Sequence, residues 1–230
     1  MRYFLPVGIE KSPGIFEKRT VSYIHETQHN LARVQSRRKI AIWLFGICFM
    51  PAFFFTNPHF EAGSWQRQWI EDIGAVLIFA AILGRAWCIM YIGGRKTSTL
   101  VTAGPYSAMR NPLYFFSFVA AAGLGAQTDS VMLALFVALA AYMIFLPVVL
   151  REGAGLSRVH GPGYDAYRHS VSRFFPRPAL WRDVVALAVD PGIWRRTVLD
   201  GIIFVLPIPL VRVLARGQTT LLDLPRVTLY

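Results

Sequence analysis

The chain has 230 residues, of which 54% are hydrophobic and 16% are charged. A soluble domain of this length carries more charge than that, and the apolar residues gather in runs of the length that bilayer-crossing helices need, about 20 residues. The net charge is +11, and the basic residues flank the apolar runs, which is typical of cytoplasmic loops near anionic lipid headgroups rather than of nucleic-acid binding. Composition therefore predicts an integral membrane protein that binds no nucleic acid.

Residues 1–39 form a basic arm, which we expect to be either an interfacial amphipathic helix or disordered. We expect no cleavable signal peptide, since no apolar core lies near Met1. Both cysteines, Cys48 and Cys88, lie inside apolar runs. They read as buried small apolar residues, and two cysteines cannot build a zinc site alone, so we expect no metal.

Five apolar runs follow the arm as candidate membrane helices, at residues 40–55, 70–92, 113–126, 131–150 and 198–214. The third is short, and the tight connection 127–130 makes a hairpin of the third and fourth. Two prolines interrupt the fifth, which spans the bilayer, re-enters it or lies on its surface. We therefore predict an all-α integral membrane protein of about five transmembrane helices. Its parts are the arm 1–39, a core at 40–176 and an extension at 177–230 with the weak fifth segment.

Charge asymmetry predicts the orientation. If every run spans, most basic residues fall on one side, whereas the loop 56–69 holds one basic residue, Arg67, and 127–130 holds none. The positive-inside rule then places the N-terminus in the cytoplasm, with the polar blocks before the third run and after the fourth. Arg85 lies within the second run, where we expect it to snorkel to the surface or to have an internal partner.

The first polar block covers residues 100–114. Its Gly104-Pro105 pair predicts a turn, and Pro112 suits the first turn of the third helix. Arg110 and Asn111 would then lie at a helix N-terminus, where exposed N–H groups favour an anion. An ordinary entry from a loop into a helix fits the same residues.

The second polar block covers residues 152–176. Glu152 directly follows the fourth run near the bilayer edge, where a carboxylate needs a partner, a solvated cavity or a cationic ligand. Tyr164, Tyr167 and Arg173 recur in a stretch with helical spacing. Aromatic rings with cations can hold an adenine ring or a headgroup, and they can equally anchor a helix in the interface.

Both blocks resemble the signatures of one superfamily, the isoprenylcysteine carboxyl methyltransferases and phospholipid methyltransferases. The first reads L-V-x-x-G-P-Y-x-x-x-R-N-P-x-Y, and the second reads E-x-x-x-L-x-x-x-H-G-x-x-Y-x-x-Y-x-x-x-V-x-R-F-F-P. Their order, their spacing and the hairpin between them agree with the family over residues 92–176.

The resemblance implies a membrane methyltransferase that uses S-adenosylmethionine, bound in a pocket at the cytoplasmic helix ends. A lipophilic acceptor would enter from the bilayer. The residues that the resemblance places at the cofactor are Tyr106, Asn111, Pro112, Tyr114, Glu152, Tyr164 and Tyr167. The residues expected to act in catalysis are Arg110 and Arg173, which would orient an acceptor carboxylate or phosphate, and His160, a candidate base.

Three departures from the family pattern stand out. Gly153 takes the place of a second acid, Phe116 stands where a small residue is common, and His160 replaces an aromatic, so that it is either a base or a packing substitute. Two other functions stay open: a membrane reductase of related fold with a nicotinamide cofactor, and a non-catalytic membrane subunit. The arm 1–39 and the extension 177–230 are the places where protein partners would bind.

Overall fold

The computed structural model describes residues 56–58, 64–93, 99–187, 189–202, 205 and 227–229. The chain divides into two compact units at residues 44 and 45, and all described residues belong to the second. The predicted N-terminal arm, Cys48 and the first apolar run lie outside the described residues.

The described elements are helical apart from one pair of short strands, which confirms the predicted helical class. In chain order they are β1 (Thr56–Pro58), α2 (Trp65–Ile92), α3 (Pro105–Ala108), α4 (Pro112–Ala126), α5 (Val131–His160), α6 (Pro162–Ser170), the 3-10 turn η1 (Pro178–Leu180), α7 (Pro191–Ile202) and β2 (Val227–Leu229). The two strands pair in parallel, with Thr56 opposite Val227. The sequence analysis did not anticipate this pairing, because three residues are too few to form a periodic pattern.

Among the described residues, two helices are long and apolar enough to cross a membrane, α2 with 28 residues and α5 with 30. At 1.5 Å per residue they extend about 42 and 45 Å, more than the roughly 30 Å of a bilayer core. Only 33% of the apolar window of each is buried in the protein, so most of these side chains face outward. α4 is apolar but has 15 residues. The total of five spans stays a prediction.

Three helix boundaries differ from the prediction. α2 begins at Trp65 rather than at residue 70, and α7 begins at Pro191 rather than at 198. α5 continues ten residues past Leu150, so Glu152 lies within this helix and does not follow it. Each predicted boundary was the edge of an apolar run. Such an edge marks where a helix leaves the bilayer, whereas the backbone hydrogen bonds of the helix continue beyond it. The rest of the predicted fifth run lies almost wholly outside the described part.

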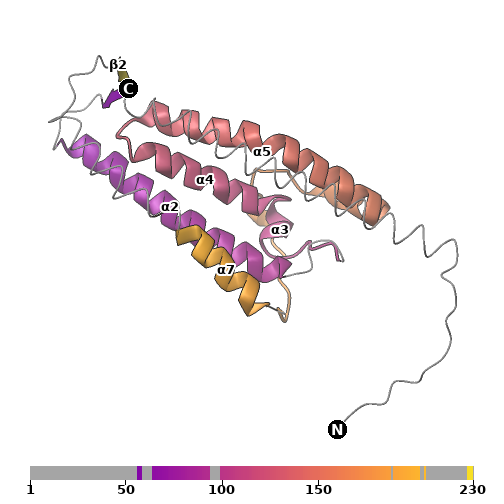
Figure 1. Ribbon diagram of the computed structural model, residues 1–230. Helices are drawn as coiled ribbons and strands as arrows, with labels where there is room; N and C mark the ends of the chain where they lie inside the picture. The colour runs from indigo at the N-terminus through magenta and orange to yellow at the C-terminus, as the bar shows by residue number, and fades with distance from the viewer. Residues whose placement is uncertain are drawn as a thin grey trace, which may run out of the picture. The chain divides into compact units, whose positions relative to one another are not determined.

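α4 lies between α2 and α5 in one layer of helices (Figure 1). Glycines allow the close approach. A Cβ on Gly123 would lie 2.6 Å from the carbonyl oxygen of Gly74 on α2, and one on Gly125 would lie 2.5 Å from the Cα of Ala134 on α5. Small residues at such contacts are characteristic of helix packing in membranes.

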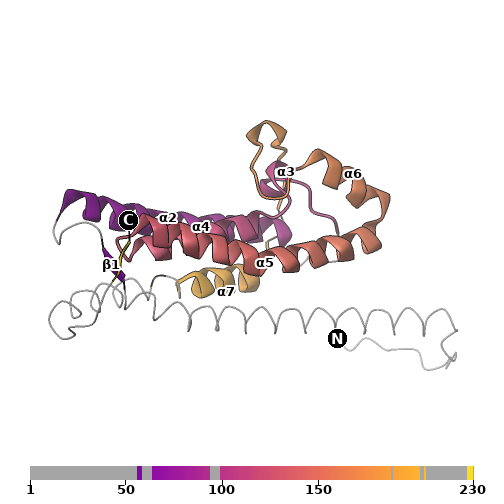
Figure 2. The same cartoon turned by 90° about the horizontal axis from the view of Figure 1, so that it is seen from above.

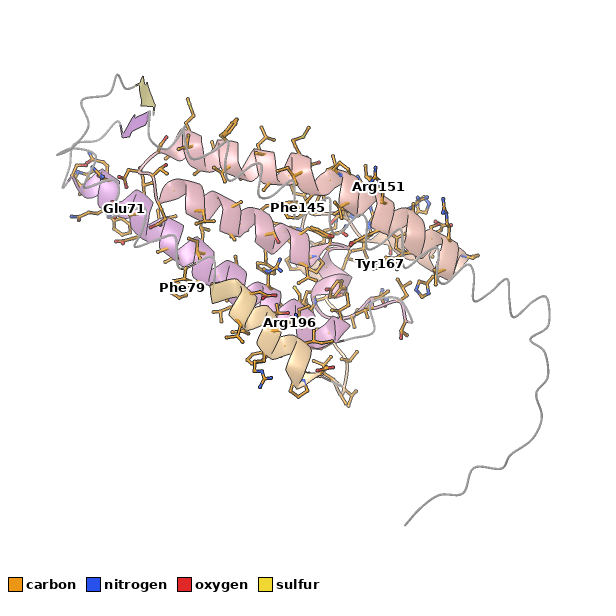
Figure 3. All side chains as sticks on the ribbon, viewed as in Figure 1. Glu71, Phe79, Phe145, Arg151, Tyr167 and Arg196 are labelled. Carbon is orange, nitrogen blue, oxygen red and sulfur yellow. The ribbon has the colours of Figure 1, made fainter. Side chains whose placement is uncertain are left out.

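At one end of this layer, the α4–α5 turn is tied to the start of α2. Arg67 pairs with Asp129 at 2.5 Å and with Glu71 at 3.6 Å. The side-chain amide of Gln127 donates to the main-chain carbonyl of Glu71 at 2.8 Å. Figure 3 shows Glu71 at the far end of the layer from Tyr167, which belongs to the polar blocks.

α7 packs along α2 on the face of the layer opposite α3 (Figure 2). The segment before α7 is also fixed to α2. The rings of Trp87 and Trp181 stack with centroids 5.2 Å apart, and the Tyr91 hydroxyl donates to Asp183 at 2.9 Å. Residues just beyond the matched stretch 92–176 therefore pack on the core.

Candidate functional site

The two polar blocks meet. Residues 172–182, which we call the strap, run alongside residues 104–111. Four backbone hydrogen bonds join them: Arg110 N–H to Ser172 O at 2.9 Å, Asn111 N–H to Arg173 O at 3.2 Å, Arg177 N–H to Ala108 O at 3.0 Å and Gly104 N–H to Arg182 O at 2.6 Å. Because main-chain groups make these bonds, they set the position of the first block independently of side-chain identity.

Side chains join the blocks as well. The Tyr114 hydroxyl on α4 donates to Glu152 on α5 at 2.9 Å. The Tyr167 hydroxyl on α6 donates to the main-chain carbonyl of Tyr106 at 2.6 Å. Asn111 precedes α4, but its side-chain amide donates to the Arg173 carbonyl at 3.2 Å and does not cap the helix. Six predicted site residues, three from each block, are thus joined directly across the two blocks.

Three polar atoms in this region are buried and have no hydrogen-bond partner among the described residues: the Tyr106 hydroxyl, Arg110 Nε and His160 Nε2. Tyr106 is only 6% exposed. Buried polar groups are nearly always paired in a folded protein, and an unpaired one costs free energy. The unsatisfied Tyr106 hydroxyl, on which the charge of Glu152 acts, and the unsatisfied Arg110 Nε therefore fit a small polar ligand with hydroxyl, amino and carboxylate groups, such as S-adenosylmethionine.

Two tyrosines of the site are held neutral. Burial raises the pKa of Tyr106 well above its usual value, and the neighbouring Cys88, Tyr167 and Glu152 raise it further, against the opposing charge of Arg85. Burial likewise raises the pKa of Tyr167, partly offset by Arg110. Both hydroxyls keep their protons at neutral pH, so they serve as hydrogen-bond donors and not as bases.

The remaining predicted residues differ in position. Pro112 is buried as the first residue of α4, as predicted, and Tyr164 is buried on α6. Arg173 is exposed. His160 ends α5, eight residues beyond Glu152, or about 12 Å along a helix, so the two side chains cannot share one small reacting group.

Tyr164 explains part of the Gly153 departure. A Cβ on Gly153 would lie 3.0 Å from the Tyr164 hydroxyl. The glycine thus leaves room for the Tyr164 hydroxyl close to α5, at the position beside Glu152 where the family pattern has a second acid.

The sequence analysis did not include Arg85 in the site. Its guanidinium donates from within α2 to the Leu113 carbonyl at 3.2 Å and to Ser117 Oγ at 2.5 Å. It therefore has an internal partner, one of the two alternatives left open above. Its charge acts on the Tyr106 hydroxyl, which places it near the floor of the site. A cation within an apolar run was the signal that could have identified it.

Aromatic rings separate the site from the apolar faces of α4 and α5. Phe145 contacts Tyr114 with ring centroids 5.5 Å apart, and Phe118 contacts Phe174 of the strap at 5.3 Å and Tyr142 at 5.7 Å. Within the described residues, no group of three or more His, Cys, Asp or Glu side chains could hold a metal ion.

Comparison with known proteins agrees with the signatures. A family model described as phospholipid methyltransferase matches residues 71–162. The chain is 36% identical over 173 residues to the nickel-cobalt-cadmium resistance protein NccN of Alcaligenes xylosoxydans xylosoxydans, covering 74% of this chain and 79% of that protein. It is 32% identical over 169 residues to the cobalt-zinc-cadmium resistance protein CzcN of Cupriavidus metallidurans, covering 74% and 78%. No solved structure matches.

The match to the family model begins within α2, at residue 71, and ends at the first residue of α6, so it includes all of α5 and most of α2, the two described helices that could cross a membrane. The family and these helices together indicate an integral membrane protein. The chain belongs to the phospholipid methyltransferase family, within the superfamily that also holds the isoprenylcysteine carboxyl methyltransferases.

Proposed function

We propose that this protein is an integral membrane methyltransferase that moves a methyl group from S-adenosylmethionine to a lipophilic acceptor. The observation that carries the proposal is the meeting of the two polar blocks. Glu152 and Tyr114 are hydrogen-bonded there, next to the buried, unpartnered Tyr106 hydroxyl. The acceptor is a prenylcysteine-like carboxylate, a lipid amine or a small hydrophobic metabolite.

Glu152, Tyr106 and Tyr114 would hold S-adenosylmethionine, which would supply a methyl group on a positively charged sulfonium sulfur to a lone pair of the acceptor, with the electron pair of the carbon–sulfur bond left on sulfur. Glu152 then binds the cofactor and does not remove a proton. The sulfonium sulfur loses its positive charge as the methyl group leaves, so a nearby anion stabilises the ground state more than the transition state. Tyr106 and Arg110 supply donors, and Arg110 and Arg173 orient an acidic acceptor. Alignment and the exclusion of water are the main contributions of the protein.

Cofactor titration tests the proposal. Purified protein in lipid nanodiscs is titrated with S-adenosylmethionine by calorimetry. Tyr114→Phe removes the donor to Glu152, and since a hydrogen bond to a charged group contributes about 1.5–3 kcal/mol, we expect the dissociation constant to rise about tenfold or more. Asp72→Asn is the control, because this exposed acid lies on the first turns of α2 at the far end of the layer.

The same titration separates this function from a reductase. Binding of a nicotinamide cofactor without binding of S-adenosylmethionine would overturn the proposal. Incubation with lipid extracts should add the mass of one methylene to a lipophilic component, and Glu152→Gln should lower that yield. Cofactor binding with no methylated product from any extract would instead support a non-catalytic subunit.

The names of the two relatives suggest a setting for the activity. NccN and CzcN are named for resistance to nickel, cobalt, zinc and cadmium. We propose that methylation of its acceptor by this chain contributes to tolerance of such divalent cations. Growth of a deletion strain on graded cadmium or cobalt, complemented with wild type or Glu152→Gln, tests the link; equal rescue by both would separate resistance from methyl transfer.

A further inference from the structure

The strap has two faces of different character. Phe174 points inward and packs on Phe118 and Tyr142, with ring centroids 5.3 and 5.6 Å away. The next residue, Phe175, is 82% exposed. A turn closed by the Ser172 hydroxyl donating to the Phe175 carbonyl separates the two rings. Since Phe174 is fixed to α4 and α5, Phe175 has to project away from them.

Arginines lie on both sides of Phe175 along the strap. Arg173, Arg177 and Arg182 are exposed, and none of them pairs with a carboxylate among the described residues. The nearest acid in the chain, Asp183, already accepts hydrogen bonds from the Tyr91 hydroxyl and the Val184 amide. The outer face of the strap therefore carries three uncompensated positive charges.

Further partly or fully exposed apolar side chains lie at the end of the strap and just after it. Trp181 is 39% exposed, Val184 is 41% exposed, and Val185 is fully exposed. The backbone bonds to the first block hold the strap firmly, so the apolar residues are displayed on a fixed scaffold. Exposed apolar residues among arginines are the signature of a segment that lies in the headgroup region of a membrane.

We propose that the strap is an anchor for an anionic lipid surface, with Phe175 entering the acyl boundary and Arg177 and Arg182 contacting lipid phosphates. The strap is at the level where α2 ends and α4 begins, standing off the face of the helix layer (Figure 2). At that level it meets the edge of the bilayer in which α2 and α5 lie. Charge complementarity selects an anionic surface over a zwitterionic one.

Anchoring would also affect the site, a consequence that rests on the proposed function. The strap's main chain holds Arg110 and Asn111, so a strap ordered by lipid presents a better ordered cofactor pocket. We expect S-adenosylmethionine to bind more tightly in anionic nanodiscs than in zwitterionic ones.

The test measures the depth of Phe175 directly and needs no activity. A bimane label on Phe175→Cys, in a Cys48→Ser background with the buried Cys88 retained, is quenched by nitroxide lipids in nanodiscs. We expect quenching at least about twofold stronger than for a label on Val159→Cys, which is 56% exposed in the last turn of α5. We also expect an increase when about 30% of the lipid is anionic and a decrease at high salt.

Two double variants that remove the same charge show which arginines cause the response to anionic lipid. Arg177→Gln with Arg182→Gln should abolish the response to anionic lipid, whereas Arg195→Gln with Arg196→Gln, which removes the same charge from exposed positions on α7, should keep it. Equal quenching at Phe175 and Val159, or equal loss in both double variants, would overturn the anchor. If S-adenosylmethionine bound in no lipid while the quenching result held, the proposed function would fail and the anchor would stand.

Discussion

Gly153 and Gly155 lie two residues apart on α5, yet their surroundings differ. A Cβ on Gly153 would be 3.0 Å from the Tyr164 hydroxyl, whereas one on Gly155 would meet nothing within 4 Å. Both glycines carry the same backbone cost in a helix, about 0.5–1 kcal/mol relative to alanine. The pair therefore separates the effect of helix propensity from the effect of crowding at the site.

We expect Gly155→Ala to raise the free energy of unfolding by about 0.5–1 kcal/mol and to leave the affinity for S-adenosylmethionine unchanged. Gly153→Ala gains the same helix propensity but displaces Tyr164, and overpacking of this kind costs about 1–3 kcal/mol. We therefore expect this variant to have a lower or unchanged free energy of unfolding and a weaker affinity for S-adenosylmethionine. Thermal unfolding and calorimetry on both variants check this. Equal stabilisation with unaltered affinity in both would show that Tyr164 is not constrained by the glycine.

At the scale of elements, the contact between α2 and α4 pairs a glycine on one helix with an aromatic ring on the other. The ring of Phe116 on α4 lies directly over Gly84 on α2, so close that a Cβ at Gly84 would overlap it. Phe116 was the position where a small residue had been expected. The small residue of this contact is Gly84 on the facing helix α2, and the ring of Phe116 fills the space between the two helices.

Gly84→Ala should therefore destabilise the protein by about 1–3 kcal/mol through overpacking. Adding Phe116→Ala should recover much of that loss, and a double-mutant cycle should give a coupling energy of about 0.5–3 kcal/mol. Leu83→Ala is the control, because Leu83 is 70% exposed on the same helix. Additive effects of Gly84→Ala and Phe116→Ala on the free energy of unfolding would contradict this packing.

The turn between α4 and α5 gives a prediction about pH. Burial and a hydrogen bond shared with Glu71 raise the pKa of Asp129 from its ordinary 3.8 to about 7, against the opposing charge of Arg67. A carboxyl with a raised pKa binds its proton more tightly in the folded than in the unfolded chain. Its protonation thus stabilises the fold at low pH, and this stabilisation is lost as the pH rises through about 7.

Asp129→Asn mimics the protonated form, and asparagine tolerates the positive φ of 62° at this position. We expect the free energy of unfolding of the wild type to fall between acidic and mildly alkaline pH, while that of Asp129→Asn changes little. Asp72→Asn, an exposed acid on neighbouring α2, should behave as the wild type. A wild-type profile parallel to that of Asp129→Asn would show that Asp129 stays ionised throughout.

Much of this arrangement was readable from the sequence. Apolar runs located α2, α4 and α5, and Gly104 and Pro112 located the entry to α4. The hairpin correctly implied that the two polar blocks meet. The facing of Gly84 and Phe116, the pairing of the strap with residues 104–111 and the bonding of Arg85 were not readable, because each depends on which faces of distant elements come into contact.

At the scale of the whole molecule, the described charges divide between the two ends of the helix layer. At the end of the α4–α5 turn, Arg67 is compensated by Glu71 and Asp129. At the site end, the exposed cations Arg151, Arg158, Arg173, Arg177 and Arg182 have no carboxylate partner among the described residues. Basic residues near the ends of membrane helices are retained on the cytoplasmic side. The site should therefore face the cytoplasm, and the α4–α5 turn the opposite compartment.

Single cysteines in a Cys48→Ser background test this orientation in intact cells, since Cys88 is buried. An impermeant maleimide should label Gln68→Cys, exposed in the first turn of α2, without permeabilisation. It should label Ala179→Cys, exposed in the strap, only after permeabilisation. The reverse result would place the site outside, where S-adenosylmethionine is not made. Labelling of both from one side would mean that α2 does not cross the bilayer, and the site would then need another route to its lipophilic acceptor.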